Sequence, residues 1–235
     1  MKITIIGGHG KIALLTAAML SESGHQVRSV VRNEDHRSDV EETGAHCVVA
    51  DVETLDTDAL GEVLDGSEAV VWSAGAGGGN PERTYAVDRD AAIRSIDAAA
   101  ARGIPRFIMV SYVGSGRDEV PQDNPFHHYA VAKAAADDHL RSSPLQWTIL
   151  APGQLTEEEA TRKFDVGDHV THGATSRANV AHLIAAVLPR MSTAGLTLRF
   201  RDGAVALEDV LVSLERVAAG SPVAPLREGR TDLVT

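Results

Sequence analysis

A phenol and an ammonium lie four residues apart at Tyr129 and Lys133, within a stretch that predicts a helix over about residues 126–141. That spacing places both groups on one face of a helix. A tyrosine hydroxyl has a pKa of about 10 in water, and a nearby ammonium favours the phenolate and lowers this pKa. The pair could therefore act as a general acid or base beside a hydride carrier. Without that context, Tyr129 would be a packing aromatic and Lys133 a solvated cation.

Small residues recur near the start of the chain at Gly7, Gly10 and Ala13, in the spacing G-x-x-G-x-x-A, directly after the first apolar run. Such a turn lets the pyrophosphate of a dinucleotide approach the backbone and meet the N–H groups at the start of the next helix. We expect the cofactor to lie along this turn, with His9 and Lys11 as phosphate contacts or as solvated turn residues. A plain glycine turn is the alternative.

The end of the second predicted strand bears on the choice between NAD and NADP. An NAD site usually places an acidic residue there to bind the ribose 2′-hydroxyl. Here Val31 is followed by Arg32, and the first acid is Glu34. A guanidinium suits a 2′-phosphate, so the sequence favours NADP unless Arg32 is simply a surface residue. Asp51, after the third strand, could accept the adenine amino group or cap the next turn.

Strand-like and helix-like runs alternate around these motifs. Strands are expected at 3–6, 27–31, 46–50, 69–73, 107–110 and 147–150, and helices at 10–22, 37–43, 56–64, 82–102 and 126–141. This alternation implies βαβ units, and the almost wholly apolar strands imply a sheet covered on both faces. The expected fold is α/β, a Rossmann-type doubly wound parallel sheet with a small C-terminal substrate-side region.

The last third of the chain is less regular. The sequence predicts a helix capped by Asn179 and ending near residue 189, a strand near 196–200 and a helix near 206–218. We expect one domain over 1–219, substrate-side elements at 155–178 and 190–219, and a loosely held tail over 220–235.

Composition narrows the class of protein. The chain has 235 residues, a formal net charge of −11 and one cysteine, Cys47. The acidic balance argues against nucleic-acid binding and against docking on anionic lipid, and one cysteine excludes an internal disulfide. No apolar run approaches the roughly 20 residues that span a bilayer, and the ten histidines show no zinc spacing. We expect a cytoplasmic protein without a metal, a monomer or homodimer, that binds a small-molecule substrate.

The motifs together resemble the short-chain dehydrogenase/reductase superfamily, and specifically its atypical NAD(P)-binding, epimerase/dehydratase-like members. The resemblance spans about residues 1–190 and rests on the segments 7–13, 31–32, 51–52, 85–88, 107–111, 129–133 and 150–155. It implies Tyr129 as the proton donor, with Ser111, Lys133 and Asp88 in the catalytic set. It implies an NADP site formed by Gly7, Gly8, His9, Gly10, Lys11, Ile12, Arg32, Asp51, Val52, Ala74, Gly75, Lys133, Pro152, Gly153 and Gln154.

The chain departs from the family pattern at the catalytic serine. That serine is generally the second of a Ser-Ser pair ending the fifth strand, and here the pair reads Ser111-Tyr112. Ser111 would then be structural, and polarisation of the substrate would fall to Ser115 or to no residue. Three functions stay open. They are an NADP-dependent reductase of a small carbonyl, quinone or flavin-like molecule, a non-catalytic NADP-sensing protein of the NmrA-like kind, and a nucleotide-sugar epimerase or dehydratase. The short substrate side disfavours the last.

Overall fold

The computed structural model describes residues 1–77 and 80–219, and its centre is a nine-stranded sheet. The strands of this sheet are β1 (Lys2–Ile6), β2 (Gln26–Val31), β3 (His46–Val49), β4 (Ala69–Trp72), β5 (Arg106–Val110), β6 (Gln146–Pro152), β8 (Lys163–Val166), β10 (Leu196–Asp202) and β11 (Val205–Ala206). A separate parallel pair consists of β7 (Gln154–Thr156) and β9 (Ala174–Ser176).

The order across the sheet is β11-β8-β10-β6-β5-β4-β1-β2-β3. The strands from β3 to β10 run parallel, and β8 is antiparallel to β10. The order β3-β2-β1-β4-β5-β6 is that of a doubly wound nucleotide-binding sheet, in which ligands bind where the strand order reverses. The predicted Rossmann-type fold is therefore confirmed, and the reversal falls between β1 and β4.

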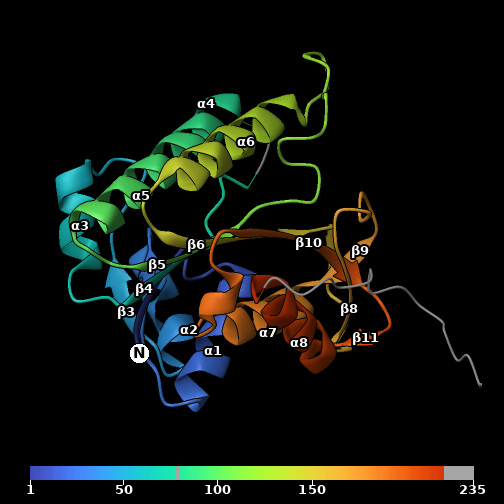
Figure 1. The fold of residues 1–235 in the computed structure, drawn as a ribbon. Helices are drawn as coiled ribbons and strands as arrows, with labels where there is room; N and C mark the ends of the chain where they lie inside the picture. Colours follow the sequence, from blue (N-terminus) through green and yellow to red (C-terminus); the bar gives the residue numbers. More distant parts are fainter. Residues whose placement is uncertain (78–79, 220–235) are drawn as a thin grey trace, which may run out of the picture.

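Helices cover both faces of the sheet (Figure 1). They are α1 (Lys11–Glu22), α2 (Arg37–Glu41), α3 (Thr57–Leu64), α4 (Pro81–Thr84), α5 (Ala92–Ala101), α6 (His127–Ser142), α7 (Arg177–Val187) and α8 (Leu207–Ala218). Helices α3 to α6 lie on one face, and α1, α2, α7 and α8 lie on the other. Side chains of β1 alternate between the two cores, because Ile3 and Ile5 pack with the α1 and α7 side while Ile6 packs with the α3 and α5 side.

The helix expected over 82–102 is divided into three segments. Between α4 and α5 the chain forms a π-helical segment, η2 (Tyr85–Ala91). Such wide turns occur often at functional sites, where they shift the side chains around the helix axis. Here the wide turn contains Asp88, whose side chain is buried in the molecule.

The cap predicted at Asn179 is wrong. Helix α7 begins at Arg177, and the Ser176 hydroxyl accepts the backbone N–H of Asn179 at 3.0 Å. Asn179 lies inside the helix, where its buried amide donates to Asp202 at 2.7 Å and to Thr161 at 3.1 Å. The short strands β7, β8, β9 and β11 were not expected either, since each has two to four residues and depends on partners distant in sequence.

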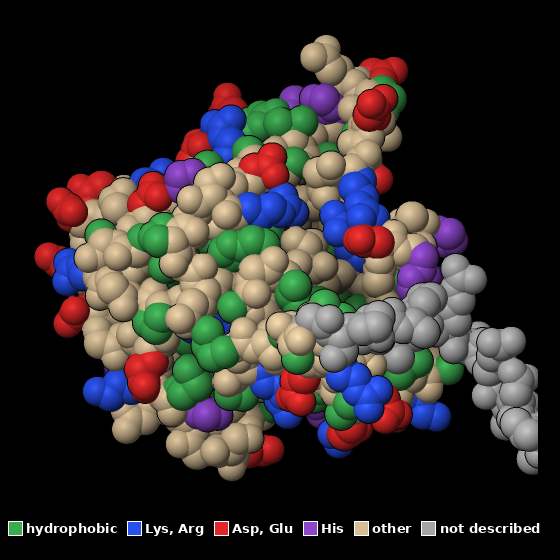
Figure 2. Space-filling model, viewed as in Figure 1, with side chains coloured by type: hydrophobic (Ala, Val, Ile, Leu, Met, Phe, Trp, Pro, Cys, Tyr) green, Lys and Arg blue, Asp and Glu red, His purple; other side chains and the backbone are tan. Residues whose placement is uncertain are grey.

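The predicted tail over 220–235 lies outside the described residues. Within the described part of the chain, no helix is long and apolar enough to cross a lipid bilayer. Acidic and basic side chains are scattered over the visible face of the molecule rather than separated by sign (Figure 2).

Candidate active site

The turn after β1 packs directly against the end of β4. Gly7 has a φ of +84°, and a Cβ added there would lie 2.5 Å from the Cα of Ala74. Only glycine therefore fits both the backbone conformation and the space. Gly10 is the N-cap of α1, and its own N–H donates to the Gly7 carbonyl at 2.9 Å. No side chain within the described ranges caps this helix, so its first N–H groups remain available to an anion.

Two cavities adjoin at this turn. They have volumes of about 720 Å³ and 370 Å³, and the segment 73–76 after β4 lines both of them. We call them the larger and the smaller cavity. Both lie at the carboxyl end of β4, beside the reversal in strand order. That is the place where an α/β sheet of this kind binds its ligand.

The smaller cavity collects the predicted residues of the glycine turn and of the strands next to it. Arg32 lines it, half-exposed, with its Nη1 3.6 Å from Oε2 of Glu53. Arg83, from α4, approaches the same carboxylate oxygen at 3.4 Å. Asp51 also caps its own turn, because its Oδ1 accepts the N–H of Glu53 at 3.1 Å. The predicted residues that line this cavity are Gly7, His9, Gly10, Arg32, Asp51, Val52, Ala74 and Gly75.

Sequence reasoning did not find Arg83 or Glu53. Glu53 lies two residues after Asp51 in the loop that follows β3, and its carboxylate is largely buried. Arg83 comes from α4, thirty residues further along the chain, and its guanidinium also donates to the Ala76 carbonyl at 3.4 Å. No local spacing relates these two residues, so only the fold reveals that two guanidiniums share one carboxylate.

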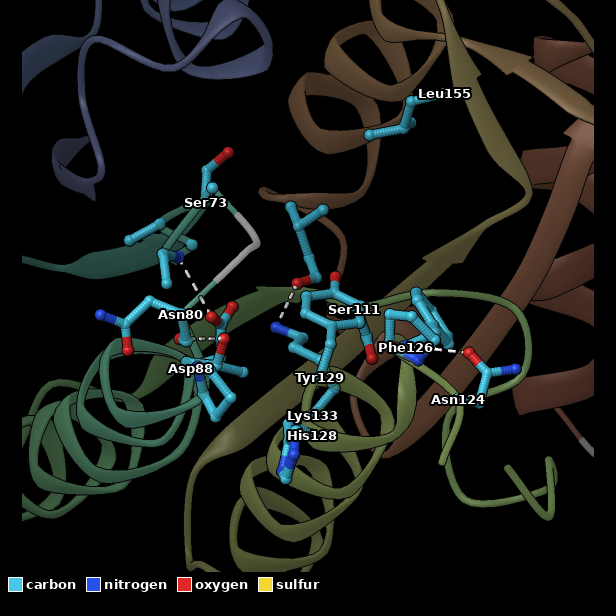
Figure 3. Close-up of a pocket in the computed structure, with 18 of the residues that line it drawn as sticks. Ser73, Asn80, Asp88, Ser111, Asn124, Phe126, His128, Tyr129, Lys133 and Leu155 are labelled. Atoms are coloured by element: carbon cyan, nitrogen blue, oxygen red, sulfur yellow. Dashed lines mark hydrogen bonds between the residues drawn. The ribbon is translucent and has the colours of Figure 1, made fainter. Parts of the chain in front are cut away.

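The larger cavity contains Tyr129 and Lys133 of α6 (Figure 3). Lys133 is fully buried, and its Nζ donates to the Val110 carbonyl at 2.8 Å and lies 3.7 Å from the sulfur of Met109. An ammonium has three donors, so a buried donor is left for a ligand. Burial lowers the pKa of Lys133, while the nearby carboxylates of Asp137 and Asp88 act in the opposite direction.

The expectation that Lys133 lowers the pKa of Tyr129 is wrong. Burial raises the pKa of Tyr129, and the charges of Asp88 and Asp137 raise it further. The physical reason is that burial removes water from the phenol and so disfavours the phenolate, and the nearby negative charges of Asp88 and Asp137 act in the same direction. No residue within 1–77 and 80–219 hydrogen-bonds the Tyr129 hydroxyl, which is not among the fully buried unpaired atoms. Tyr129 is therefore a protonated phenol at neutral pH that lines the larger cavity.

Both candidate serines are bound to one buried carboxylate. The hydroxyls of Ser111 and Ser115 each donate to Oδ2 of Asp137 at 2.5 Å. Ser111 lines the larger cavity and Ser115 does not. Because the Ser111 proton points to Asp137, this side chain offers the cavity lone pairs rather than a donor. Burial raises the pKa of Asp137, and the Lys133 charge opposes that rise.

Asp137 was missed by sequence reasoning, although a signal for it existed. It follows Lys133 by four residues, as Lys133 follows Tyr129, so all three side chains share one face of α6. Asp88 makes a similar buried contact on the opposite helix. Its Oδ2 accepts the N–H of Ala76 at 3.0 Å, and this bond fixes the segment shared by the two cavities. Burial also raises the pKa of Asp88.

Several predicted residues lie outside both cavities. Lys11 pairs with Glu157 at 2.8 Å, and Gly8 packs against Ser29 of β2. Gly153 donates its N–H to the Phe200 carbonyl at 2.9 Å within the sheet. The structure places these residues, with Pro152 and Gln154, around the site rather than in its lining.

Two hydrophobic residues from flanking segments line the larger cavity. Leu155, the residue after Gln154, lies across the cavity from α6 (Figure 3). Ile12, predicted for the cofactor, lines the same cavity from the start of α1. Tyr112, which stands in the family's serine position, packs with its ring centroid 5.6 Å from that of Tyr129. The Tyr112 ring therefore packs against the ring of Tyr129, the proposed proton donor.

A family model described as NAD(P)H-binding matches residues 7–190. The chain belongs to the NAD(P)H-binding family. The match starts at the glycine turn and runs through α7, so it includes both cavities. The resemblance to atypical, epimerase/dehydratase-like members of the short-chain dehydrogenase/reductase superfamily is confirmed by this match and by the proteins that the chain is similar to.

Three similar proteins cover nearly the whole chain. The uncharacterized sugar epimerase YhfK of Bacillus subtilis is 32% identical over 216 residues, which are 91% of this chain and 100% of that one. A candidate NAD-dependent epimerase/dehydratase from Bacillus halodurans has 35% identity and a TM-score of 0.83, with 90% and 99% of the two chains covered. The oxidoreductase ylbE of Lactococcus lactis has 28% identity and a TM-score of 0.82, with 91% and 96% covered.

The residues present fit an NAD(P) dinucleotide. The close contact of Gly7 with Ala74 leaves no room for a side chain at that position of the turn, and the uncapped start of α1 suits a pyrophosphate. The buried Lys133 retains a donor for a ribose hydroxyl. Gly7, Gly10 and the start of α1 would hold the pyrophosphate, and Lys133 the nicotinamide ribose. When bound, the nicotinamide supplies or accepts a hydride.

Proposed function

We propose that the protein is an NADPH-dependent reductase of a small carbonyl compound, with Tyr129 as the proton donor. The observation that carries the proposal is the position of Tyr129. It lines the larger cavity together with Lys133 and the segment 73–76 that both cavities share, and its phenol is protonated at neutral pH. An acid in this position suits reduction, since the oxygen of a carbonyl needs a proton as hydride reaches its carbon.

Each side chain of the site has one task in this reaction. Lys133 orients the nicotinamide ribose through its remaining donor, and Asp88 fixes the segment after β4 that both cavities share. Tyr129 gives its proton to the carbonyl oxygen and regains a proton from water. Asp137 holds Ser111 and Ser115 and balances part of the charge of Lys133.

The preference for NADP over NAD is supported by the two guanidiniums of the smaller cavity. Arg32 and Arg83 both approach Glu53, so they are already gathered beside the end of β2. An anionic 2′-phosphate would take the place of that carboxylate between them. NADH has a hydroxyl instead of a phosphate at the 2′ position, so neither guanidinium can strengthen its binding through an ion pair.

Removal of Arg32 should separate the two cofactors. In Arg32→Ala, the dissociation constant for NADPH should rise by about tenfold, the value of one charge-assisted contact, while that for NADH stays within twofold. Equilibrium fluorescence titration of both cofactors measures this. Equal losses for NADPH and NADH would dismiss the 2′-phosphate role.

The reductase proposal is tested by NADPH oxidation against carbonyls, quinones and flavins. Tyr129→Phe should lower kcat by a factor of about 10² to 10⁴ on the best carbonyl, with the dissociation constant for NADPH unchanged. The matched control is Tyr112→Phe, which removes a hydroxyl from the ring behind Tyr129. Full activity in Tyr129→Phe would contradict the acid role.

One observation favours a second candidate, a non-catalytic NADP-sensing protein. Ser111 and Ser115 both give their protons to Asp137, so neither hydroxyl is free to polarise a carbonyl. Tight NADPH binding together with no turnover across the whole panel would support the sensor and contradict the reductase.

A further inference from the structure

Aromatic side chains gather around the larger cavity. The chain has three tyrosines and four phenylalanines. Phe126 and Tyr129 line the cavity, with ring centroids 5.1 Å apart. Tyr112 packs against Phe126 at 5.2 Å and completes this aromatic wall. The third tyrosine, Tyr85, does not line the cavity itself. Its hydroxyl lies 3.1 Å from Nδ1 of His128, which does. All three tyrosines therefore belong to this site.

Phe126 is exposed where the other phenylalanines are fully buried. It is 43% exposed, directly before α6, whereas Phe107, Phe164 and Phe200 are all at 0%. Its ring faces the larger cavity from the end of the connection between β5 and α6. An exposed ring beside a catalytic phenol is the arrangement that stacks on a planar ligand.

The described lining of the larger cavity is poor in cations. Its acids are Asp88 and Asp123, and its one ammonium is Lys133, which is buried and assigned to the ribose. Its one imidazole is His128, whose Nδ1 lies 3.1 Å from the Tyr85 hydroxyl. The other polar lining residues on the β5–α6 connection are Ser111, whose hydroxyl donates to Asp137, and the neutral amides Gln122 and Asn124. The smaller cavity differs, because Arg32 and Arg83 both line it. The smaller cavity thus offers an anion two guanidiniums, and the described lining of the larger cavity offers it none.

We infer that the substrate is a planar aromatic aldehyde or ketone without an anionic group. This inference rests on the proposed reductase function and specifies its substrate class. The carbonyl carbon receives the hydride of NADPH, and the carbonyl oxygen receives the proton of Tyr129. Tyr129 regains a proton from water, so aldehyde, NADPH and one proton become alcohol and NADP⁺.

The same lining disfavours a nucleotide sugar. A sugar ring could stack on Phe126, but the diphosphate would find no guanidinium in the described lining, and the one ammonium, Lys133, is assigned to the ribose. A buried or half-buried anion without such a partner is costly. Asp123, at the exposed side of the cavity, would repel it further.

Three para-substituted benzaldehydes of similar size but different charge test the inference. They are methyl 4-formylbenzoate, which is neutral, 4-formylbenzoate, which is anionic, and 4-(trimethylammonio)benzaldehyde, which is cationic. With NADPH, kcat/KM for the ester and for the cation should exceed that for the carboxylate at least tenfold. Asp123→Lys should raise kcat/KM for the carboxylate at least threefold relative to the ester. The control Glu119→Lys has the same charge change in the same connection, outside the cavity lining, and should leave the ratio unchanged.

Binding gives a readout that does not depend on turnover. Saturation-transfer NMR of the product alcohols, with NADP⁺ present, should show contact for the ester and none for the carboxylate. Phe126→Ala should abolish that contact, and Phe126→Leu, which keeps an apolar side chain of similar size, checks that the fold is intact. A carboxylate that is reduced or bound as well as the ester would overturn the inference and leave the reductase standing. If no carbonyl is reduced but the ester alcohol alone binds, the reductase falls and the ligand class stands.

Discussion

The protonation state of Tyr129 depends on residues that are far from it in sequence. The spacing of Tyr129 and Lys133 predicted that they share a helix face, and the structure places both at the larger cavity. It could not predict the sign of the pKa shift, because Asp88 comes from another helix and burial depends on the whole packing. A raised pKa keeps Tyr129 protonated, the state from which it can donate a proton, although it also makes the phenol a weaker acid.

The pH dependence of the reaction follows from that shift. Tyr129 must be protonated to donate, so a raised pKa moves the loss of activity to higher pH. With NADPH, kcat/KM should stay level from pH 7 to about pH 10, the pKa of a free tyrosine. A steady-state pH profile of wild type measures this. A decline between pH 7 and 9 that Tyr112→Phe does not alter would show that Tyr129 ionises earlier than its surroundings imply.

Asp137 should contribute to stability far more than its neighbour Asp138. Asp137→Ala leaves the buried Lys133 ammonium without its nearest balancing charge and removes the acceptor of Ser111 and Ser115. Loss of one partner from such a buried set costs about 3 to 5 kcal/mol. Asp138→Ala breaks a surface pair with Arg141 and should cost under about 1 kcal/mol. Urea unfolding measures both, and similar values would contradict the structural role of Asp137.

At the scale of elements, the turn between β1 and α1 was the most predictable part of the site. The spacing of Gly7, Gly10 and Ala13 predicts a backbone that passes close to another segment. At Gly7 the structure shows that this segment is the one after β4, where Ala74 is the neighbour. The π-helical turn η2 and the short strands β7 to β9 were not predictable. They depend on long-range packing, and three to seven residues carry no readable periodicity.

Gly7 and Gly24 form a matched pair for testing the turn. Both have positive φ, at +84° and +81°, but a Cβ on Gly24 would meet no atom within 4 Å. Gly24→Ala should therefore cost only the backbone strain of about 1 to 2 kcal/mol. Gly7→Ala adds the collision with Ala74, worth about 1 to 3 kcal/mol more, and should weaken NADPH binding at least tenfold. Thermal unfolding and NADPH titration check both variants, and equal behaviour would refute the close-approach role of Gly7.

At the scale of the molecule, a buried arginine joins the nucleotide-binding half to the last third of the chain. Arg106 of β5 donates to the Val187 and Leu188 carbonyls at the end of α7, at 2.9 and 3.1 Å. It also bonds the Thr193 hydroxyl at 2.8 Å. These bonds satisfy carbonyls that a helix end leaves without partners. The last third of the chain is therefore bonded to the central sheet.

The site as a whole exceeds what local patterns could predict. Alternation of strands and helices was enough for the doubly wound sheet, since each βαβ unit is a local signal. The two cavities instead combine loops from β1, β4 and β5 with α4 and α6. For that reason Arg83 and Phe126 emerged only from the fold, while Tyr129, Lys133 and the glycine turn were visible in the sequence.

The most direct measurement is the distance from the nicotinamide C4 to the Tyr129 hydroxyl oxygen in a crystal of the complex with NADPH. A carbonyl must fit between them, with its carbon about 3 to 3.5 Å from the hydride donor and its oxygen about 3 Å from the hydroxyl. We expect a distance of about 4 to 6 Å, with the pyrophosphate at Gly7 and Gly10. A nicotinamide ring outside the larger cavity, or one more than about 8 Å from Tyr129, would contradict it, since no proton could then reach the reacting oxygen.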